Sequence, residues 1–203
     1  MSSLFELYDN QVVSDKVLFL YHGTGGNETD LLPLIEPLAA THRVIGLRGN
    51  VQQQGLNRFF IRNPDGTFDQ ESVLSEVSNL QLFLSTWCEE NSVSPENILH
   101  VGYSNGANFI LANLLLHPES VTTAALLHPM LPLIPPETLQ LTKHHLFVSW
   151  SQNDEMMPAE KSRELLRVLE QAQANLSIFH SNNGHRITLE EVSSMHVFLK
   201  MLL

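Results

Sequence analysis

The strongest constraint on the fold is a regular alternation of short apolar runs with segments of helical periodicity. Apolar runs typical of buried strands lie at 17–21, 43–47, 98–103, 122–127, 145–150 and 174–179. Helices are expected at 28–40, 70–92, 105–116, 158–172 and 188–203. Strands that alternate with helices are joined by helical crossovers and therefore pair in parallel. The pattern predicts an α/β fold, a mostly parallel central sheet with helices on both faces.

Length and composition narrow the class of protein further. A chain of 203 residues predicts a single domain, 1–203. The formal net charge of −11 argues against nucleic acid and against an anionic membrane surface as partners. One cysteine, Cys88, cannot form an internal disulfide. The N-terminal residues do not resemble a signal peptide, and no apolar run is long enough to span a bilayer, so we expect a soluble cytoplasmic protein.

The segment Gly102-Tyr103-Ser104-Asn105-Gly106 matches the G-x-S-x-G pattern and lies between an apolar strand and an apolar-faced helix. This is the setting of a nucleophile elbow, where a sharp turn holds the serine in a strained backbone conformation. The two glycines are needed because a side chain at either position would clash. The Ser104 hydroxyl is then exposed at a helix N-terminus, where backbone N–H groups favour negative charge. The alternative is a glycine-rich turn whose serine only caps the helix.

A serine hydroxyl is a weak nucleophile and needs a general base, which we expect on a loop late in the chain. His185 meets this requirement, because it follows the last strand and precedes the last helix. The acid should follow the preceding strand, where Asp154 stands, with its neighbour Glu155 as the competing candidate. The resulting order of Ser104, Asp154 and His185 is typical of nucleophile-elbow hydrolases.

A glycine-rich turn, His-Gly-Thr-Gly-Gly at 22–26, follows the first buried strand. Such a turn lets backbone N–H groups approach a reacting oxygen, so we expect an oxyanion hole formed by the N–H groups of Thr24 and Asn105. Phosphate binding is disfavoured, because the turn matches neither common glycine pattern of nucleotide sites. His22 is expected mainly to brace this loop through side-chain hydrogen bonds.

Side chains near these motifs are candidates for substrate binding. Arg48 and Arg58 flank an irregular segment, 49–69. Two interpretations remain open: the arginines hold an anionic substrate group, or they pin the loop by binding backbone carbonyls or a carboxylate. The second interpretation is preferred. Two phenylalanines and two methionines are candidate apolar walls, although each also suits a core position. The full candidate set is His22, Arg48, Arg58, Phe59, Phe60, His128, Met130 and Met156.

The ten histidines show no spacing typical of a metal site, neither H-E-x-x-H nor a Cys/His cluster. We therefore expect no metal and no cofactor. The connection 128–144 contains four prolines, at 129, 132, 135 and 136, and has no room for a helical cap domain. An uncapped site is open and shallow, so we expect a preference for short acyl chains.

Together these motifs resemble the phospholipase/carboxylesterase family of compact α/β-hydrolases, and within it the hydroquinone-associated carboxylesterase branch. The resemblance covers nearly the whole chain, and its motifs appear in family order. It implies an α/β-hydrolase fold and a carboxylic-ester hydrolase with the triad Ser104, Asp154 and His185. One departure is Trp150-Ser151, where relatives often carry small residues. The matching stretches are 22–26, 47–50, 57–60, 102–108, 128–130, 153–154, 184–185, Thr188 and 190–191.

The function we expect is hydrolysis of small soluble carboxylic esters by acyl transfer to Ser104, with His185 as base and Asp154 orienting it. Two alternatives remain: a thioesterase or acyltransferase with the same triad, and a non-catalytic binding protein of this fold. A dienelactone-hydrolase-like enzyme is disfavoured, because its nucleophile would be cysteine. The expected partner is a small-molecule ester. The sequence leaves open whether the chain forms a homodimer.

Overall fold

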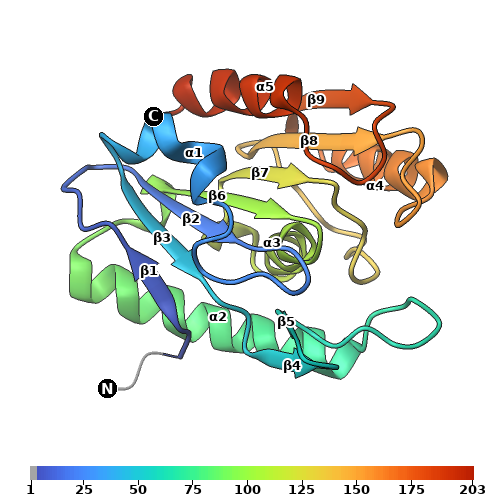
Figure 1. The fold of residues 1–203 in the computed structure, drawn as a ribbon, viewed down its shortest axis with the longest axis horizontal. Helices are drawn as coiled ribbons and strands as arrows, with labels where there is room; N and C mark the ends of the chain where they lie inside the picture. The colour runs from blue at the N-terminus through green and yellow to red at the C-terminus, as the bar shows by residue number, and fades with distance from the viewer. Residues whose placement is uncertain (1–3) are drawn as a thin grey trace.

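The computed structural model describes residues 4–203 and arranges them around a seven-stranded sheet (Figure 1). The strand order is β1-β3-β2-β6-β7-β8-β9, and all neighbours pair in parallel except β1, which runs antiparallel to β3. This is the mostly parallel sheet that the strand–helix alternation predicts. The strands are β1 (Leu7–Asp9), β2 (Val17–Tyr21), β3 (Arg43–Leu47), β6 (Ile98–Tyr103), β7 (Thr123–Leu127), β8 (His145–Ser151) and β9 (Asn175–Ser181).

Helices cover both faces of the sheet (Figure 1). One face carries α2 (Gln70–Asn91), α3 (Asn105–Leu116) and α4 (Ala159–Gln171), and the other carries α1 (Leu32–Ala39) and α5 (Leu189–Lys200). Successive residues of β2 point to opposite faces. Phe19 therefore shares one core with Trp87 and Phe109, whereas Leu18 shares the other with Met195. Burial on both faces explains why the strands are continuous apolar runs.

The first helix is shorter than expected. Asn27, the expected cap of a helix over 28–40, instead closes a turn by accepting hydrogen bonds from the backbone and hydroxyl of Thr29. The backbone of Glu28 lies directly against Gly46 of β3, where a Cβ atom would come within 1.8 Å of the Glu28 carbonyl oxygen. This close approach holds the chain outside the helix, and α1 begins only at its proline-containing first turn.

The sequence predicted that the segment 49–69 is irregular, and this prediction is only partly correct. It contains a hairpin, in which β4 (Val51–Gln53) pairs antiparallel with β5 (Leu56–Arg58). The two turn residues, Gln54 and Gly55, have φ values of 55° and 77°, which is the backbone of a two-residue hairpin turn. Strand β1 was also not predicted, because three residues are too few to show an alternation of apolar and polar positions.

The connection between β7 and β8 forms no helix or strand, as its prolines predict. Within residues 4–203 no cap domain therefore covers the carboxyl edge of the sheet. Apart from α1, the bounds of the predicted helices and strands agree with the structure to within three residues. None of the helices in this range combines the length and the apolar character needed to cross a membrane.

Candidate active site

Five candidate residues lie on loops that follow five parallel strands. Thr24 follows β2, Ser104 follows β6, His128 follows β7, Asp154 follows β8 and His185 follows β9. The carboxyl ends of parallel strands meet at one edge of a sheet, which is where ligands bind in folds of this kind. Residues separated by up to 161 positions in the sequence, 24 to 185, are thereby brought into one site.

Ser104 occupies a strained turn between β6 and α3, with φ 51° and ψ −111°. A Cβ atom on Gly106 would lie 2.1 Å from the carbonyl oxygen of Tyr21, and one on Gly102 would lie 2.6 Å from the Ile110 side chain. The expected strain and the expected need for both glycines are thus confirmed. The Ser104 side chain forms no cap hydrogen bond to α3, so the helix-cap alternative does not describe it.

A continuous hydrogen-bond series begins at the serine hydroxyl. The Ser104 hydroxyl lies 2.8 Å from His185 Nε2 and can donate to it, while His185 Nδ1 lies 2.7 Å from Asp154 Oδ2. The other carboxylate oxygen of Asp154 accepts from the backbone N–H groups of Met156 and Met157, at 2.8 Å and 3.0 Å. The carboxylate is therefore held from both sides, and it fixes His185 in the tautomer that leaves Nε2 free to accept a proton.

Two further contacts place the histidine loop. The Tyr103 hydroxyl donates to the backbone carbonyl of His185 at 2.7 Å, and the Gly184 N–H donates to the Ser151 hydroxyl at 3.0 Å. Gly184 has φ 70°, a conformation that favours glycine. The competing acid Glu155 is exposed, whereas Asp154 is buried, so the acid that faces His185 is Asp154.

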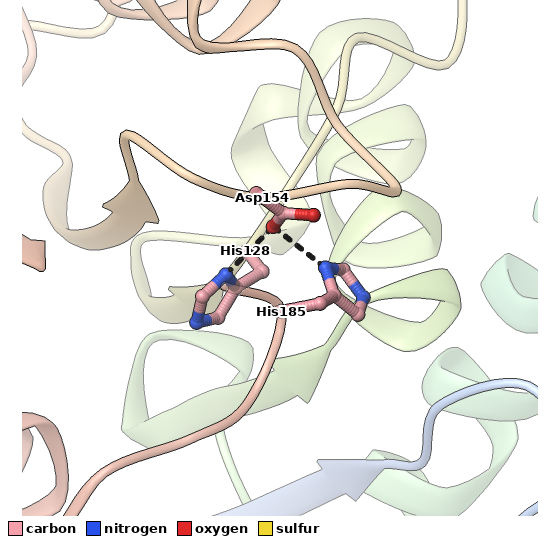
Figure 2. Close-up of side chains that lie close together, drawn as sticks. All are labelled: His128, Asp154 and His185. Carbon is pink, nitrogen blue, oxygen red and sulfur yellow. Dashed lines mark hydrogen bonds and ion pairs between the residues drawn. The ribbon is translucent and has the colours of Figure 1, made fainter. Parts of the chain in front are cut away.

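Figure 2 shows that the Asp154 carboxylate lies between two imidazole rings. His128 Nδ1 lies 3.1 Å from the same Oδ2 atom that accepts from His185. Burial opposes the charged form of Asp154, but the hydrogen bonds from His185 and His128 hold the pKa of this carboxyl below its usual range. Asp154 is consequently an anion at neutral pH.

His128 borders the cavity, as the sequence suggested. Its side chain is only 1 % exposed and is hydrogen-bonded to Asp154, a contact that the sequence did not indicate. Its Nε2 atom lies 3.4 Å from Glu191 Oε2. Glu191 was not predicted as a site residue. The sequence showed it only in the capping box with Thr188, which is present in the structure, and within a stretch that matches the family.

Thr24 and Asn105, whose backbone N–H groups are assigned to the oxyanion hole, border the same cavity as Ser104. Asn105 is the first residue of α3, where a backbone N–H has no partner within the helix. Its side chain accepts from the Phe59 N–H at 2.8 Å, which fixes the start of the helix. The cavity is small, about 30 Å³, and is bordered by Thr24, Arg58, Arg62, Phe68, Ser104, Asn105, Asn108, His128, Met130, Met156, Met157 and His185.

His22 is a brace and not a substrate ligand. Its Nδ1 donates to the Gly23 carbonyl at 2.6 Å, and its Nε2 accepts from the Gly49 N–H at 3.0 Å. A ring that donates at one nitrogen and accepts at the other is neutral, and burial lowers the pKa of His22 accordingly. His22 is therefore not in a position to bind substrate, contrary to the sequence-based expectation, whereas its expected role in holding the 22–26 loop is confirmed.

Three other candidates lie outside the cavity. Phe59 and Phe60 are 1 % and 0 % exposed and belong to the core between the sheet and α3. Arg48 forms ion pairs with Glu28, at 2.6 Å, and with Glu6. Arg48 therefore has the loop-pinning role that the sequence favoured for both arginines.

Arg58, Met130 and Met156 do border the cavity, together with four residues that the sequence did not indicate. Arg62 and Phe68 lie in the 49–69 segment, which has no periodicity that would show which of its side chains face the cavity. Asn108 is on α3, and Met157 follows Asp154 in the chain.

One group of side chains in the described range could hold a metal ion, namely His128, Asp154 and His185, whose ligand atoms lie within 4.8 Å of one another. In the structure Asp154 Oδ2 already accepts from both imidazoles. An ion would have to replace both hydrogen bonds and would uncouple His185 from its carboxylate. The geometry therefore favours a hydrogen-bonded arrangement over a metal centre.

A mostly parallel sheet, a strained serine elbow and a histidine–carboxylate pair at the carboxyl edge define an α/β-hydrolase. A model of the dienelactone hydrolase family matches residues 65–196. The chain belongs to the dienelactone hydrolase family. Ser104 still differs from the cysteine expected in a dienelactone hydrolase, but this difference concerns the nucleophile and does not exclude the family.

Two of the similar proteins are named for hydrolysis. MhqD of Bacillus subtilis (strain 168), provisionally named a hydrolase, is 36% identical over 188 residues, covering 92% of this chain and 94% of its own. The carboxylesterase of Bacillus cereus has a TM-score of 0.94 and 33% identity, covering 100% of this chain and 96% of its own. YahD, solved with malic acid, has a TM-score of 0.91 and 30% identity, covering 98% and 100%. The chain is an ester-hydrolysing enzyme, as the sequence resemblance implied.

The elbow allows a test of its steric basis. We expect Gly106→Ala to lower the free energy of unfolding by about 3 kcal/mol, because its Cβ would overlap the backbone of β2. Gly55→Ala is the matched control: Gly55 has φ 77° but nothing within 4 Å, so only the backbone cost of about 1 kcal/mol applies. Urea denaturation measures both. Equal costs for the two variants would show that the close approach is absent.

Proposed function

We propose that this enzyme hydrolyses small carboxylic esters through an acyl-enzyme on Ser104. The observation that carries the proposal is the unbroken hydrogen-bond series from the Ser104 hydroxyl through His185 to the anionic Asp154. His185 Nε2 takes the hydroxyl proton as Ser104 attacks the ester carbonyl, and the Asp154 carboxylate stabilises the resulting imidazolium. His185 then returns the proton to the leaving alkoxide, which departs as the alcohol.

The second half of the proposed reaction uses the same groups. A water molecule gives a proton to His185 and its oxygen attacks the acyl carbonyl, and the proton returns to Ser104 as the carboxylic acid leaves. In both halves negative charge develops on the carbonyl oxygen. Thr24 and Asn105 border the cavity on which Ser104 opens, and their backbone N–H groups are the donors we assign to that oxygen. The carboxylesterase from Bacillus cereus supports this assignment of the reaction class.

The shape of the site supports small substrates. The cavity at Ser104 is small, about 30 Å³. It adjoins a wider groove of about 720 Å³, with which it shares Arg62, Phe68, Met130 and Met156. The groove is lined mainly by apolar side chains and is open to solvent, and Ile134 on its rim is 91 % exposed. An acyl chain that leaves the cavity would therefore contact apolar side chains on one side and water on the other. YahD, which was solved with malic acid, shows that a relative accommodates a small polar molecule.

Removal of the nucleophile tests the mechanism. We expect a fluorophosphonate probe to label Ser104, and Ser104→Ala to abolish labelling and lower kcat/KM by about 10⁴-fold or more. Ser85→Ala, an exposed serine on α2, is the control and should retain both properties. Circular dichroism establishes that each variant is folded. Undiminished ester hydrolysis by folded Ser104→Ala would refute the acyl-enzyme.

Acyl-chain length tests the shape argument. A fully buried methylene contributes about 0.8 kcal/mol, and only the first few carbons can be buried beside Ser104. We therefore expect kcat/KM on p-nitrophenyl esters, measured from acetate to palmitate, to reach its maximum at about C2 to C6. No increase should occur above the critical micelle concentration. A maximum at C12 or longer would mean that the open groove buries the chain.

A further inference from the structure

The hydrogen-bond series that begins at the Ser104 hydroxyl does not end at Asp154. It continues from Asp154 Oδ2 to Nδ1 of His128, at 3.1 Å, and from Nε2 of His128 to Oε2 of Glu191, at 3.4 Å. The side chains of these three residues are at most 1 % exposed. The proposed mechanism uses the first carboxylate but gives no role to the second histidine and the second carboxylate.

Three separate elements bring these side chains together. His128 follows β7, Asp154 follows β8, and Glu191 lies in the first turn of α5. Figure 2 shows the Asp154 carboxylate between the imidazoles of His128 and His185. The backbone of His128 has φ 52°, so that His128 and Ser104 are two non-glycine residues of the site with a positive φ. Backbone strain of this kind persists only where surrounding contacts hold it, and it is typical of functional sites.

The surroundings of Glu191 favour its ionised form. Its carboxylate accepts hydrogen bonds from the Ser149 hydroxyl and, at 3.3 Å, from the Thr188 N–H. It also lies at the start of α5, where unpaired backbone N–H groups and the helix dipole favour negative charge. A buried carboxyl with two donors and a helix N-terminus beside it is therefore an anion that needs a nearby cation.

His128 supplies that cation. Both of its ring nitrogens face carboxylate oxygens, and an ionised carboxylate can only accept, so each nitrogen donates and the ring is an imidazolium. Burial disfavours the charged ring, but the hydrogen bond and the charge of Glu191, followed by those of Asp154, raise the pKa of His128. Two further titratable rings face it, those of His185 and Tyr103, with centroids 5.1 Å and 6.1 Å away.

The cation affects the catalytic base because both imidazoles share one oxygen atom. Asp154 Oδ2 lies 3.1 Å from His128 Nδ1 and 2.7 Å from His185 Nδ1. The carboxylate by itself would favour the protonated form of His185. A positive charge on the same oxygen opposes a second proton on His185. Since only neutral His185 can accept the Ser104 proton, the cation lets His185 act as base at lower pH.

We propose that His128, held as an imidazolium by Glu191, is a positioning residue that orients the Asp154 carboxylate and sets the pH above which His185 acts as base. The inference rests on the proposed function and adds to it the group that tunes the base. Two carboxylates and one imidazolium leave the buried cluster with a single negative charge while His185 is neutral. The proton that His185 takes from Ser104 then makes the cluster neutral as a whole.

The pH dependence of labelling tests this role without the natural substrate. A fluorophosphonate reacts with Ser104 only while His185 is neutral, so the labelling rate falls on the acidic side. We expect the half-maximal pH of this rate to rise by about one unit in His128→Gln, because loss of the cation stabilises protonated His185. The acidic limb of kcat/KM on a p-nitrophenyl ester should move by the same amount.

A double variant removes the charged partners together. His128→Gln alone leaves the buried Glu191 carboxylate without its cation, which is costly for folding. His128→Gln/Glu191→Gln leaves no such unpaired charge. The cation contacts Asp154 directly, whereas Glu191 lies beyond it. The half-maximal pH should therefore also rise in the double variant, although by no more than in the single variant.

Two matched controls remove similar groups elsewhere. His144→Gln replaces a buried histidine that precedes β8 and so lies at the opposite edge of the sheet from the site. Glu190→Gln removes a carboxylate from the exposed position next to Glu191 on α5. Both controls should keep the wild-type half-maximal pH. Arg58 and Arg62, two charged residues that border the cavity with His185, are the same in every variant.

The charge of the ring can be measured directly in the wild-type enzyme. In ¹⁵N-histidine-labelled protein at pH 7, His128 should show two protonated ring nitrogens, with its signals assigned by their absence from His128→Gln or the double variant. Glu191→Gln should lower the pH at which the ring loses its second proton. A single protonated nitrogen on His128 in the wild-type enzyme would mean that the ring is neutral, and the inference would then be wrong.

The outcomes separate this inference from the proposed function. A half-maximal pH that stays at the wild-type value or falls, in folded His128→Gln or the folded double variant, would overturn the inference, while labelling of Ser104 would leave the esterase proposal intact. If the wild-type enzyme is not labelled at any pH, the proposed function fails, and the ¹⁵N spectrum decides on the charged ring. Should both variants fail to fold, the wild-type ¹⁵N spectrum, assigned through the other histidines, decides in the same way.

Discussion

The site depends on how closely the first turn of α3 approaches the end of β2. Gly106 lies so near the carbonyl oxygen of Tyr21 that a Cβ atom would be 2.1 Å from it. This contact forces the chain into the turn that gives Ser104 its positive φ. The same contact brings the N–H of Asn105 to the loop that carries Thr24. A larger separation between helix and strand would move the serine and one oxyanion donor together, away from the histidine.

The residues of the hydrogen-bond series were predictable because their positions follow from topology. Ser104, Asp154 and His185 each follow a strand that is recognisable as an apolar run, and parallel strands end at one edge. The glycines at 102 and 106 add a local steric signal, which the structure confirms. The strand–helix alternation likewise predicted the sheet and the positions of its helices, because burial on both faces leaves a clear apolar pattern.

The other features of the site depend on long-range contacts that no local sequence pattern encodes. Glu191 has a local role in the capping box of α5, so nothing in its neighbourhood indicates a second partner 63 positions away, His128. Arg48 and Arg58 both flank the 49–69 segment in the sequence analysis, but their environments differ. Glu28 reaches Arg48 only because the 27–31 turn packs on β3. The sequence did not indicate this packing, because it predicted a helix that begins at residue 28.

The molecule as a whole is negatively charged, whereas two arginines border its candidate active site. The net charge of −11 repels an anionic ester at long range, but at physiological ionic strength such repulsion is screened over about 8 Å. Arg58 and Arg62 act inside that distance, on a partly buried wall where screening is weak.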